Sequence, residues 1–172
     1  MCVRMSMTLT LPWFQTNKQL GIVSYGIAMA INTFGMLIDF SCLATIDIKV
    51  EKRFRVFIAS GIIISITMII YSITMNIFVI FVLFFINGFS LAVLNSLIQI
   101  SLQNAVDSNM RTRVFEFKRA ISSALMPVGM VLAGILAEKI SMNFIILTDY
   151  TIFLILIIYL LFLTQVREII NN

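Results

Sequence analysis

Long stretches without a charged side chain dominate the pattern of this sequence. No charged residue lies between Arg55 and Asp107, and further uncharged stretches cover residues 19–38, 120–137 and 150–166. A helix needs about 20 mostly apolar residues to cross the hydrocarbon core of a bilayer. Each stretch is therefore long enough for one membrane-spanning helix, and the first is long enough for two.

The hydrophobic pattern and the turn residues together predict five full spans and one partial helix. Runs rich in β-branched residues, such as GIIISITMII, would favour a strand in water. The bilayer core offers no water to backbone amides, so these runs must form helices instead. We expect an all-α integral membrane protein with a single membrane domain, residues 1–172, that contains a partial helix in 1–14 and spans at about 22–46, 56–74, 77–100, 112–137 and 143–164.

Composition supports a membrane protein and excludes several kinds of chemistry. Hydrophobic residues make up 60% of the chain and charged residues 12%, whereas soluble domains average about 45–50% and about 25%. Histidine is absent, and Cys2 and Cys42 are too few for a disulfide framework or a metal site. No carboxylates cluster at one depth for acid–base catalysis, so we expect neither an enzyme nor a cofactor. The first apolar run ends at Pro12 without a small-residue cleavage site, which argues against a signal peptide.

Basic residues gather in two places that alternating spans put on the same side of the membrane. Short cytoplasmic loops carry an excess of lysine and arginine. We therefore expect a multi-pass protein of the cell membrane with a cytoplasmic carboxy terminus, and with only Lys18 and Lys139 on the outer side. This topology accounts for the net charge of +4, so no nucleic-acid partner is expected. The two cytoplasmic clusters are Lys49, Lys52, Arg53 and Arg55, and Arg111, Arg113, Lys118 and Arg119.

Polar side chains inside the spans are the candidate functional residues, because a polar group there needs either a structural partner or a role in a pathway. Asn87, Asn95 and Gln99 recur at multiples of four in the third full span. They either hydrogen-bond to neighbouring helices or line a substrate cavity. Asp39, in the inner half of the first full span, is either a proton-coupling residue or a gate residue held by nearby loop cations. Asp149 lies near the outer end of the last span, where we expect it to be solvated.

Small residues predict where helices approach one another closely. Gly129 and Ala133 lie four residues apart in the fourth full span, and Gly26 and Ala30 do so in the first. Such pairs let two helix backbones come near each other in a membrane. Pro127 removes one backbone hydrogen bond and should kink its helix.

Three short motifs follow one another in the second half of the chain. RTRVF at 111–115 is followed by PVG at 127–129 and by GILAE at 134–138. Their order and spacing resemble the inner loop and eleventh helix of major facilitator superfamily transporters, particularly the bacterial drug and macrolide-efflux-like branch. The positions that match the family motif are Arg111, Arg113, Pro127 and Gly129.

The resemblance covers nearly the whole chain and implies the carboxy-terminal six-helix half of a major facilitator fold. It implies a truncated or half-length secondary transporter that exports a small compound or drug by alternating access. Its partners would be the lipid bilayer, a small-molecule substrate, and either a complementary amino-terminal six-helix half or a second copy. A membrane accessory or structural subunit that transports nothing remains the alternative.

Overall fold

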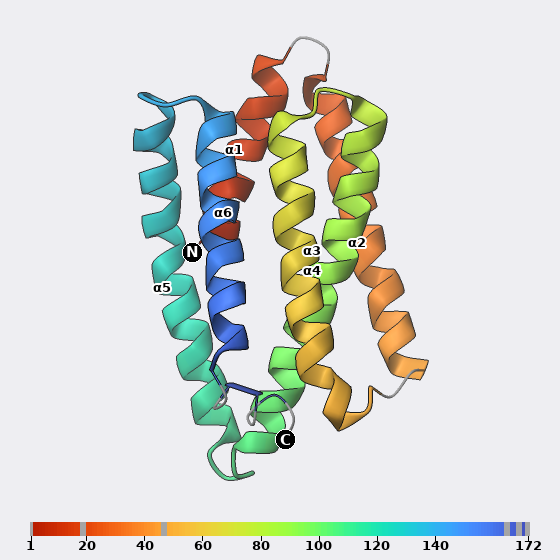
Figure 1. Ribbon diagram of the computed structural model, residues 1–172. Helices are drawn as coiled ribbons and strands as arrows, with labels where there is room; N and C mark the ends of the chain where they lie inside the picture. The colour runs from red at the N-terminus through yellow and green to blue at the C-terminus, as the bar shows by residue number, and fades with distance from the viewer. Residues whose placement is uncertain (1, 18–19, 46–47, 164–165, 168–169, 171–172) are drawn as a thin grey trace.

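The computed structural model describes residues 2–17, 20–45, 48–163, 166–167 and 170, and it places six helices there, with Val166, Arg167 and Ile170 also in helical conformation. Five of them, α2 to α6, are long and apolar enough to cross a membrane. The all-α membrane fold expected from the sequence is confirmed. The helices are α1 (Cys2–Thr16), α2 (Gly21–Thr45), α3 (Val50–Ile73), α4 (Ile77–Ala105), α5 (Arg111–Ala137) and α6 (Met142–Leu161) (Figure 1).

The helices lie roughly along one axis and alternate in direction (Figure 1). The last residues of α2 and α4 and the first residues of α3 and α5 therefore lie at the same end of the bundle. The basic residues at the start of α3 and at the start of α5 share that end, as alternating spans require.

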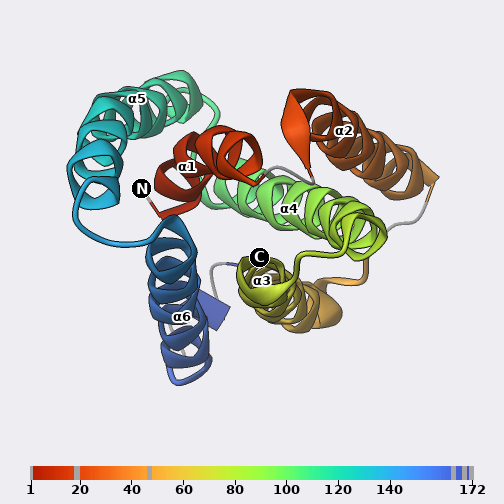
Figure 2. The same ribbon diagram turned by 90° about the horizontal axis from the view of Figure 1, so that it is seen from above.

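Helix α4 occupies the middle of the bundle, and α2 and α5 lie at its edges. Seen from above, α4 packs against α2 and α3, while α1 lies between α5 and the rest (Figure 2). Helix α3 also packs against α6, and α1 also packs against α6 and α2. Only Gly129 and Ala133 of α5 are buried among its described residues, which agrees with the predicted close approach of another helix at these two positions.

An aromatic cluster ties α1 to α3 and α4. The rings of Trp13 and Tyr71 lie 4.8 Å apart, and those of Tyr71 and Phe84 lie 5.2 Å apart, both in edge-to-face geometry. Phe14 packs against the same rings and, like Tyr71, is fully buried. Edge-to-face pairs of this kind add about 0.5–1.5 kcal/mol beyond the burial of their area. The cluster thus gives the short helix α1 a fixed place against two full spans.

Two glycines allow α2 and α4 to touch backbone to backbone. A Cβ atom added to Gly88 would overlap the carbonyl oxygen of Asn32, and one added to Gly35 would lie 2.5 Å from the carbonyl oxygen of Phe85. Gly26, the small residue that we expected at a close approach, faces open space instead. The close contact between α2 and α4 therefore lies at Asn32 and Gly35, further along α2 than the predicted pair Gly26 and Ala30.

Some helices extend further than the predicted ranges. Helix α1 continues through Pro12 to Thr16, beyond the predicted end at 14, and α5 remains one helix through Pro127. Helix α3 begins at Val50 rather than at 56, and α4 ends at Ala105 rather than at 100. Hydropathy marks only the part of a helix that lies in hydrocarbon, whereas backbone hydrogen bonding continues into the polar boundary.

Candidate substrate cavity

A cavity of about 700 Å³ lies where α1, α2, α4, α5 and α6 meet. Its volume falls within the range of sites for small molecules, about 300–1,000 Å³. Apolar side chains from all five helices line it, including Met7, Met36, Leu91 and Phe153. Its polar lining comes from α4 and α5 and consists of Asn95, Arg119, Ser122 and Ser123.

The three polar residues predicted on α4 do not act together. Asn95 lines the cavity, and one of its amide N–H groups donates to the carbonyl oxygen of Leu91 at 2.9 Å. Its side-chain oxygen is an acceptor that this bond does not use. Gln99 is exposed and lies outside the residues that line the cavity. Asn95 alone of the three therefore has a place in this cavity.

Asn87 instead belongs to the interface between α2 and α4. The side-chain amide of Asn32 donates to the carbonyl oxygen of Phe84 at 2.9 Å and to Oδ1 of Asn87 at 3.5 Å. Both asparagines are buried, and with Thr10 and Tyr150 they border a second, very small cavity of about 10 Å³. Interhelical hydrogen bonding therefore describes Asn87 better than a place in the large cavity does.

Asp39 is buried in the interior of α2, with 1% of its surface exposed. Its Oδ2 atom has no hydrogen-bond partner among the described residues. Among the described residues no ion pair joins Asp39 to the loop cations that would hold a gate residue, and the Nε of Arg53 donates to the carbonyl oxygen of Ile48 at 3.3 Å. A carboxylate with one oxygen unpartnered is costly inside a membrane span, so Asp39 stays a candidate for a functional role that an experiment has to test.

The four residues of the inner-loop motif lie along α5. Arg111 is its first residue, and the Nε of that side chain donates to the carbonyl oxygen of Val106 at 3.1 Å, while Arg113 is exposed. Pro127 lies within the helix, and Gly129 is buried. None of the four lines the large cavity.

The face of α5 that lines the cavity was not identified from the sequence. The charge pattern predicts Arg119 in the basic inner cluster, and it indicates no role for Ser122 and Ser123. Ser122 and Ser123 lie three and four residues after Arg119, and Met126 lies four and three residues after the two serines, which is the spacing of one helix face. This spacing is the sequence signal by which the cavity-lining face of α5 could have been identified.

Asp149 differs from its prediction. The residue is buried, with 7% of its surface exposed, and its Oδ2 atom accepts a hydrogen bond from the Oγ of Ser6 on α1 at 2.5 Å. A second bond, from Nε1 of Trp13 to Oδ1 of Asn143, joins the same two helices. The expected solvated position is wrong, because α1 packs over this part of α6 and replaces water as the partner.

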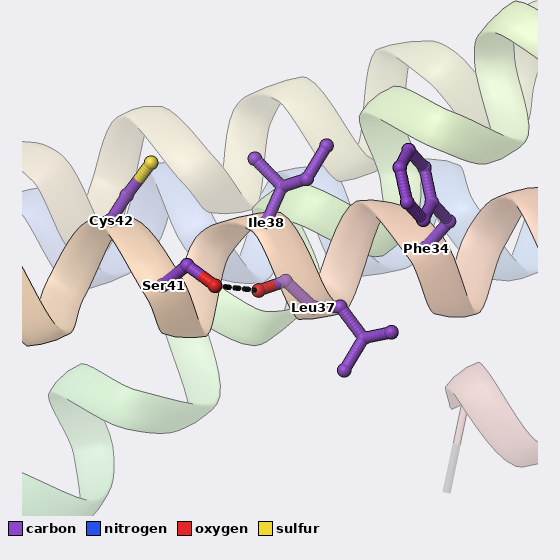
Figure 3. Close-up of a pocket in the computed structure, with 5 residues that line it drawn as sticks. All are labelled: Phe34, Leu37, Ile38, Ser41 and Cys42. Atoms are coloured by element: carbon purple, nitrogen blue, oxygen red, sulfur yellow. Dashed lines mark hydrogen bonds between the residues drawn. The ribbon is translucent and has the colours of Figure 1, made fainter.

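Another hollow, of about 420 Å³, lies on α2 alone (Figure 3). Phe34, Leu37, Ile38, Ser41 and Cys42 line it, and the hydroxyl of Ser41 donates to the carbonyl oxygen of Leu37 at 3.0 Å. Side chains of a single helix cannot surround a substrate. This hollow is a feature of the outer surface of α2, and the large cavity is the better candidate site.

The lining of the large cavity suits noncovalent binding. It combines an apolar surface with a few hydrogen-bond donors and acceptors, which is the usual composition of a small-molecule site. Within the described residues, no three histidine, cysteine or carboxylate side chains come together in a way that could hold a metal ion.

Comparison with known proteins identifies the family. Neither the curated proteins nor the solved structures gave a match to this chain. The family model of the Major Facilitator Superfamily matches residues 1–171, which is almost the whole chain. Members of this family are transporters, and the five long apolar helices agree with a multi-pass membrane protein. The chain therefore belongs to the major facilitator superfamily of membrane transporters.

Proposed function

We propose that this chain is one six-helix half of a secondary transporter that exports a small amphipathic compound or drug across the cell membrane by alternating access. In such transporters the substrate binds near the middle of the membrane, between two structural repeats that rock around it. The proposal places substrate in the large cavity, with Asn95 as a polar contact.

The observation that carries this proposal is the cavity itself. Five helices contribute to its lining, yet Asn95, Arg119 and Leu125 are exposed in the chain as described. A site for a small molecule normally buries most of the ligand surface. The cavity would gain its remaining wall from a second body, which supports pairing with a complementary six-helix unit or with a second copy.

Exposed apolar side chains on α2 and α5, two of the helices that line the cavity, support the same pairing. Phe34 and Phe40 on α2 are 59% and 55% exposed, and Val128 and Val131 on α5 are 48% and 60% exposed. Helices at the edge of the bundle need either lipid or another protein to cover such side chains. We propose that a complementary amino-terminal half covers part of this surface and completes the cavity.

Export of fluorescent amphipathic dyes tests the proposal. Three sets of cells would be compared. The first expresses this chain alone, the second expresses the amino-terminal half of a major facilitator drug exporter alone, and the third expresses both. We expect export above background only when both halves are present. Ser123→Trp should abolish it by filling the cavity, whereas Ile158→Trp, on the exposed side of α6, should not.

The same assay separates the transporter from a membrane accessory subunit. If both halves reach the membrane and associate, yet none of the dyes leaves the cell, export of these compounds is ruled out. Export that survives Ser123→Trp would show that the substrate uses a different site.

We further propose that the basic end of the bundle is cytoplasmic and that the carboxy terminus lies on that side. The excess of lysine and arginine at the starts of α3 and α5 supports this orientation. Both Lys52 and Lys139 are exposed, and they lie at opposite ends of the bundle. In a chain without Cys2 and Cys42, a membrane-impermeant maleimide applied to intact cells should label Lys139→Cys and should label Lys52→Cys only after permeabilisation. The reverse pattern would invert the topology.

A further inference from the structure

We propose that the large cavity binds an amphipathic anion, such as an organic sulfonate or carboxylate, with its charged group at Arg119 and its apolar part towards α1 and α6. This inference rests on the proposed transport function and specifies the class of substrate. Three observations support it: the charge of Arg119, the lack of an ion-pair partner for this charge among the described residues, and the positions of the polar and apolar side chains that line the cavity.

Arg119 supplies the only charge among the described residues that line the cavity. The guanidinium carries five N–H donors in a planar fork, which matches the geometry of carboxylate, sulfonate and phosphate groups. An organic cation would meet this like charge without a facing carboxylate, which disfavours the usual positively charged drug. The charge of the site therefore favours an anionic ligand.

No ion pair or hydrogen bond occupies the Arg119 guanidinium within the described part of the chain. Charged side chains in membrane spans normally face a protein interior or a water-filled cavity and have a partner there. Asp39 is the acidic residue nearest in sequence to the α2 part of the lining, three residues beyond Met36, but it is buried and does not line the cavity. A ligand could supply the missing negative charge.

Uncharged donors lie beside Arg119 at the same end of the cavity. Ser122 and Ser123 follow it on α5, and Asn95 on α4 lines the same cavity. With a rise of about 1.5 Å per residue, Arg119 lies about 12 Å along α5 from Arg111, and Asn95 lies about 15 Å along α4 from Ala105. Both end points lie at the basic end of the bundle, so these polar groups share a similar depth.

The remaining lining is apolar, and on α5 it lies further from the basic end. Met126 lies about 10 Å beyond Arg119 on the same helix at that rise, and Met7 and Phe153 line the cavity from α1 and α6. A ligand with an acidic group and an aromatic or aliphatic body would match both ends. A fully hydrophilic anion would leave the thioether and phenyl surfaces without a partner.

Binding to the purified full chain in nanodiscs of zwitterionic lipid tests this inference. Equilibrium dialysis would compare 1-naphthalenesulfonate with trimethyl(1-naphthyl)ammonium, which share one ring system and differ in charge, against empty nanodiscs. We expect the sulfonate to bind at least about tenfold more tightly. Arg119→Gln should weaken sulfonate binding by roughly tenfold to a hundredfold, as expected for the loss of a charge-assisted hydrogen bond.

Lys118→Gln is the matched control, because it removes the same charge from the neighbouring residue, which does not line the cavity. It should leave the preference for sulfonate intact. Equal binding of the two probes, or an equal loss in both variants, would overturn the anion inference while leaving a small-molecule site in place. Failure of both probes to bind above empty nanodiscs would overturn the inference and also count against the proposed site.

Discussion

Gly88→Leu is expected to separate α2 from α4 and to destabilise the chain by about 3 kcal/mol or more, the upper part of the range for overpacking. The Cβ of any larger residue at position 88 would overlap the carbonyl oxygen of Asn32. Because the obstacle is backbone, no side-chain rotation can relieve it. The same displacement would also separate Asn32 from Phe84 and Asn87, which it now contacts through hydrogen bonds.

Thermal unfolding followed by size-exclusion chromatography in detergent would measure this effect. The matched control is Gly26→Leu, because Gly26 is also in a span but has open space where its Cβ would lie. We expect Gly26→Leu to retain a monodisperse peak and nearly the original melting temperature. Equal stability of the two variants would show that α2 does not approach α4 this closely in the membrane.

Asp39→Asn tests the proton-coupling alternative for this residue: if Asp39 carries the coupling proton, the variant is expected to reduce proton-driven export at least tenfold in the assembled transporter. Asparagine has nearly the same shape as aspartate but cannot take up and release a proton. It also removes a buried carboxylate whose Oδ2 has no partner among the described residues. The variant should therefore melt at the same temperature as the original chain or higher, because an unpaired buried charge is unfavourable.

Everted vesicles with an imposed pH gradient would measure accumulation of the exported dye. Asp107→Asn is a suitable control, because it makes the same change at an exposed residue between α4 and α5. Unchanged accumulation with Asp39→Asn would reject proton coupling at this position. A higher melting temperature together with full transport would instead indicate a residue with a purely structural effect.

The sequence predicted the number of spans and the class of fold because hydrocarbon imposes one solution on apolar chains. Backbone amides in a bilayer must bond within the segment, so long uncharged stretches become helices whatever their propensity. The helix ends were less predictable. Glu51, Lys52, Arg53 and Arg55 belong to α3 although all four are charged, since a helix can project beyond the core. Pro12 did not end α1, because packing against neighbouring helices can compensate for one lost hydrogen bond.

The candidate site could be predicted only in part, because residues four apart are not strictly on one line of a helix. Successive side chains are rotated by about 100° around the helix axis, so two side chains four residues apart point in directions that differ by about 40°. Over the eight residues from Asn87 to Asn95 the drift is about 80°, enough for Asn87 to face α2 while Asn95 faces the cavity. Which helix packs against each face of α4 depends on the tertiary structure, and the spacing of polar residues in the sequence does not reveal it.

The short connection between α3 and α4 has a consequence for insertion into the membrane. Only residues 74–76 separate the two helices, and the side chain of Asn76 accepts a hydrogen bond from the amide of Phe78. The hairpin tip carries no charge, while Lys52, Arg53 and Arg55 remain at the opposite end of α3. Both helices can therefore enter the bilayer together during synthesis, with an uncharged tip crossing first and the cationic end left behind, so that no ionised side chain has to be translocated.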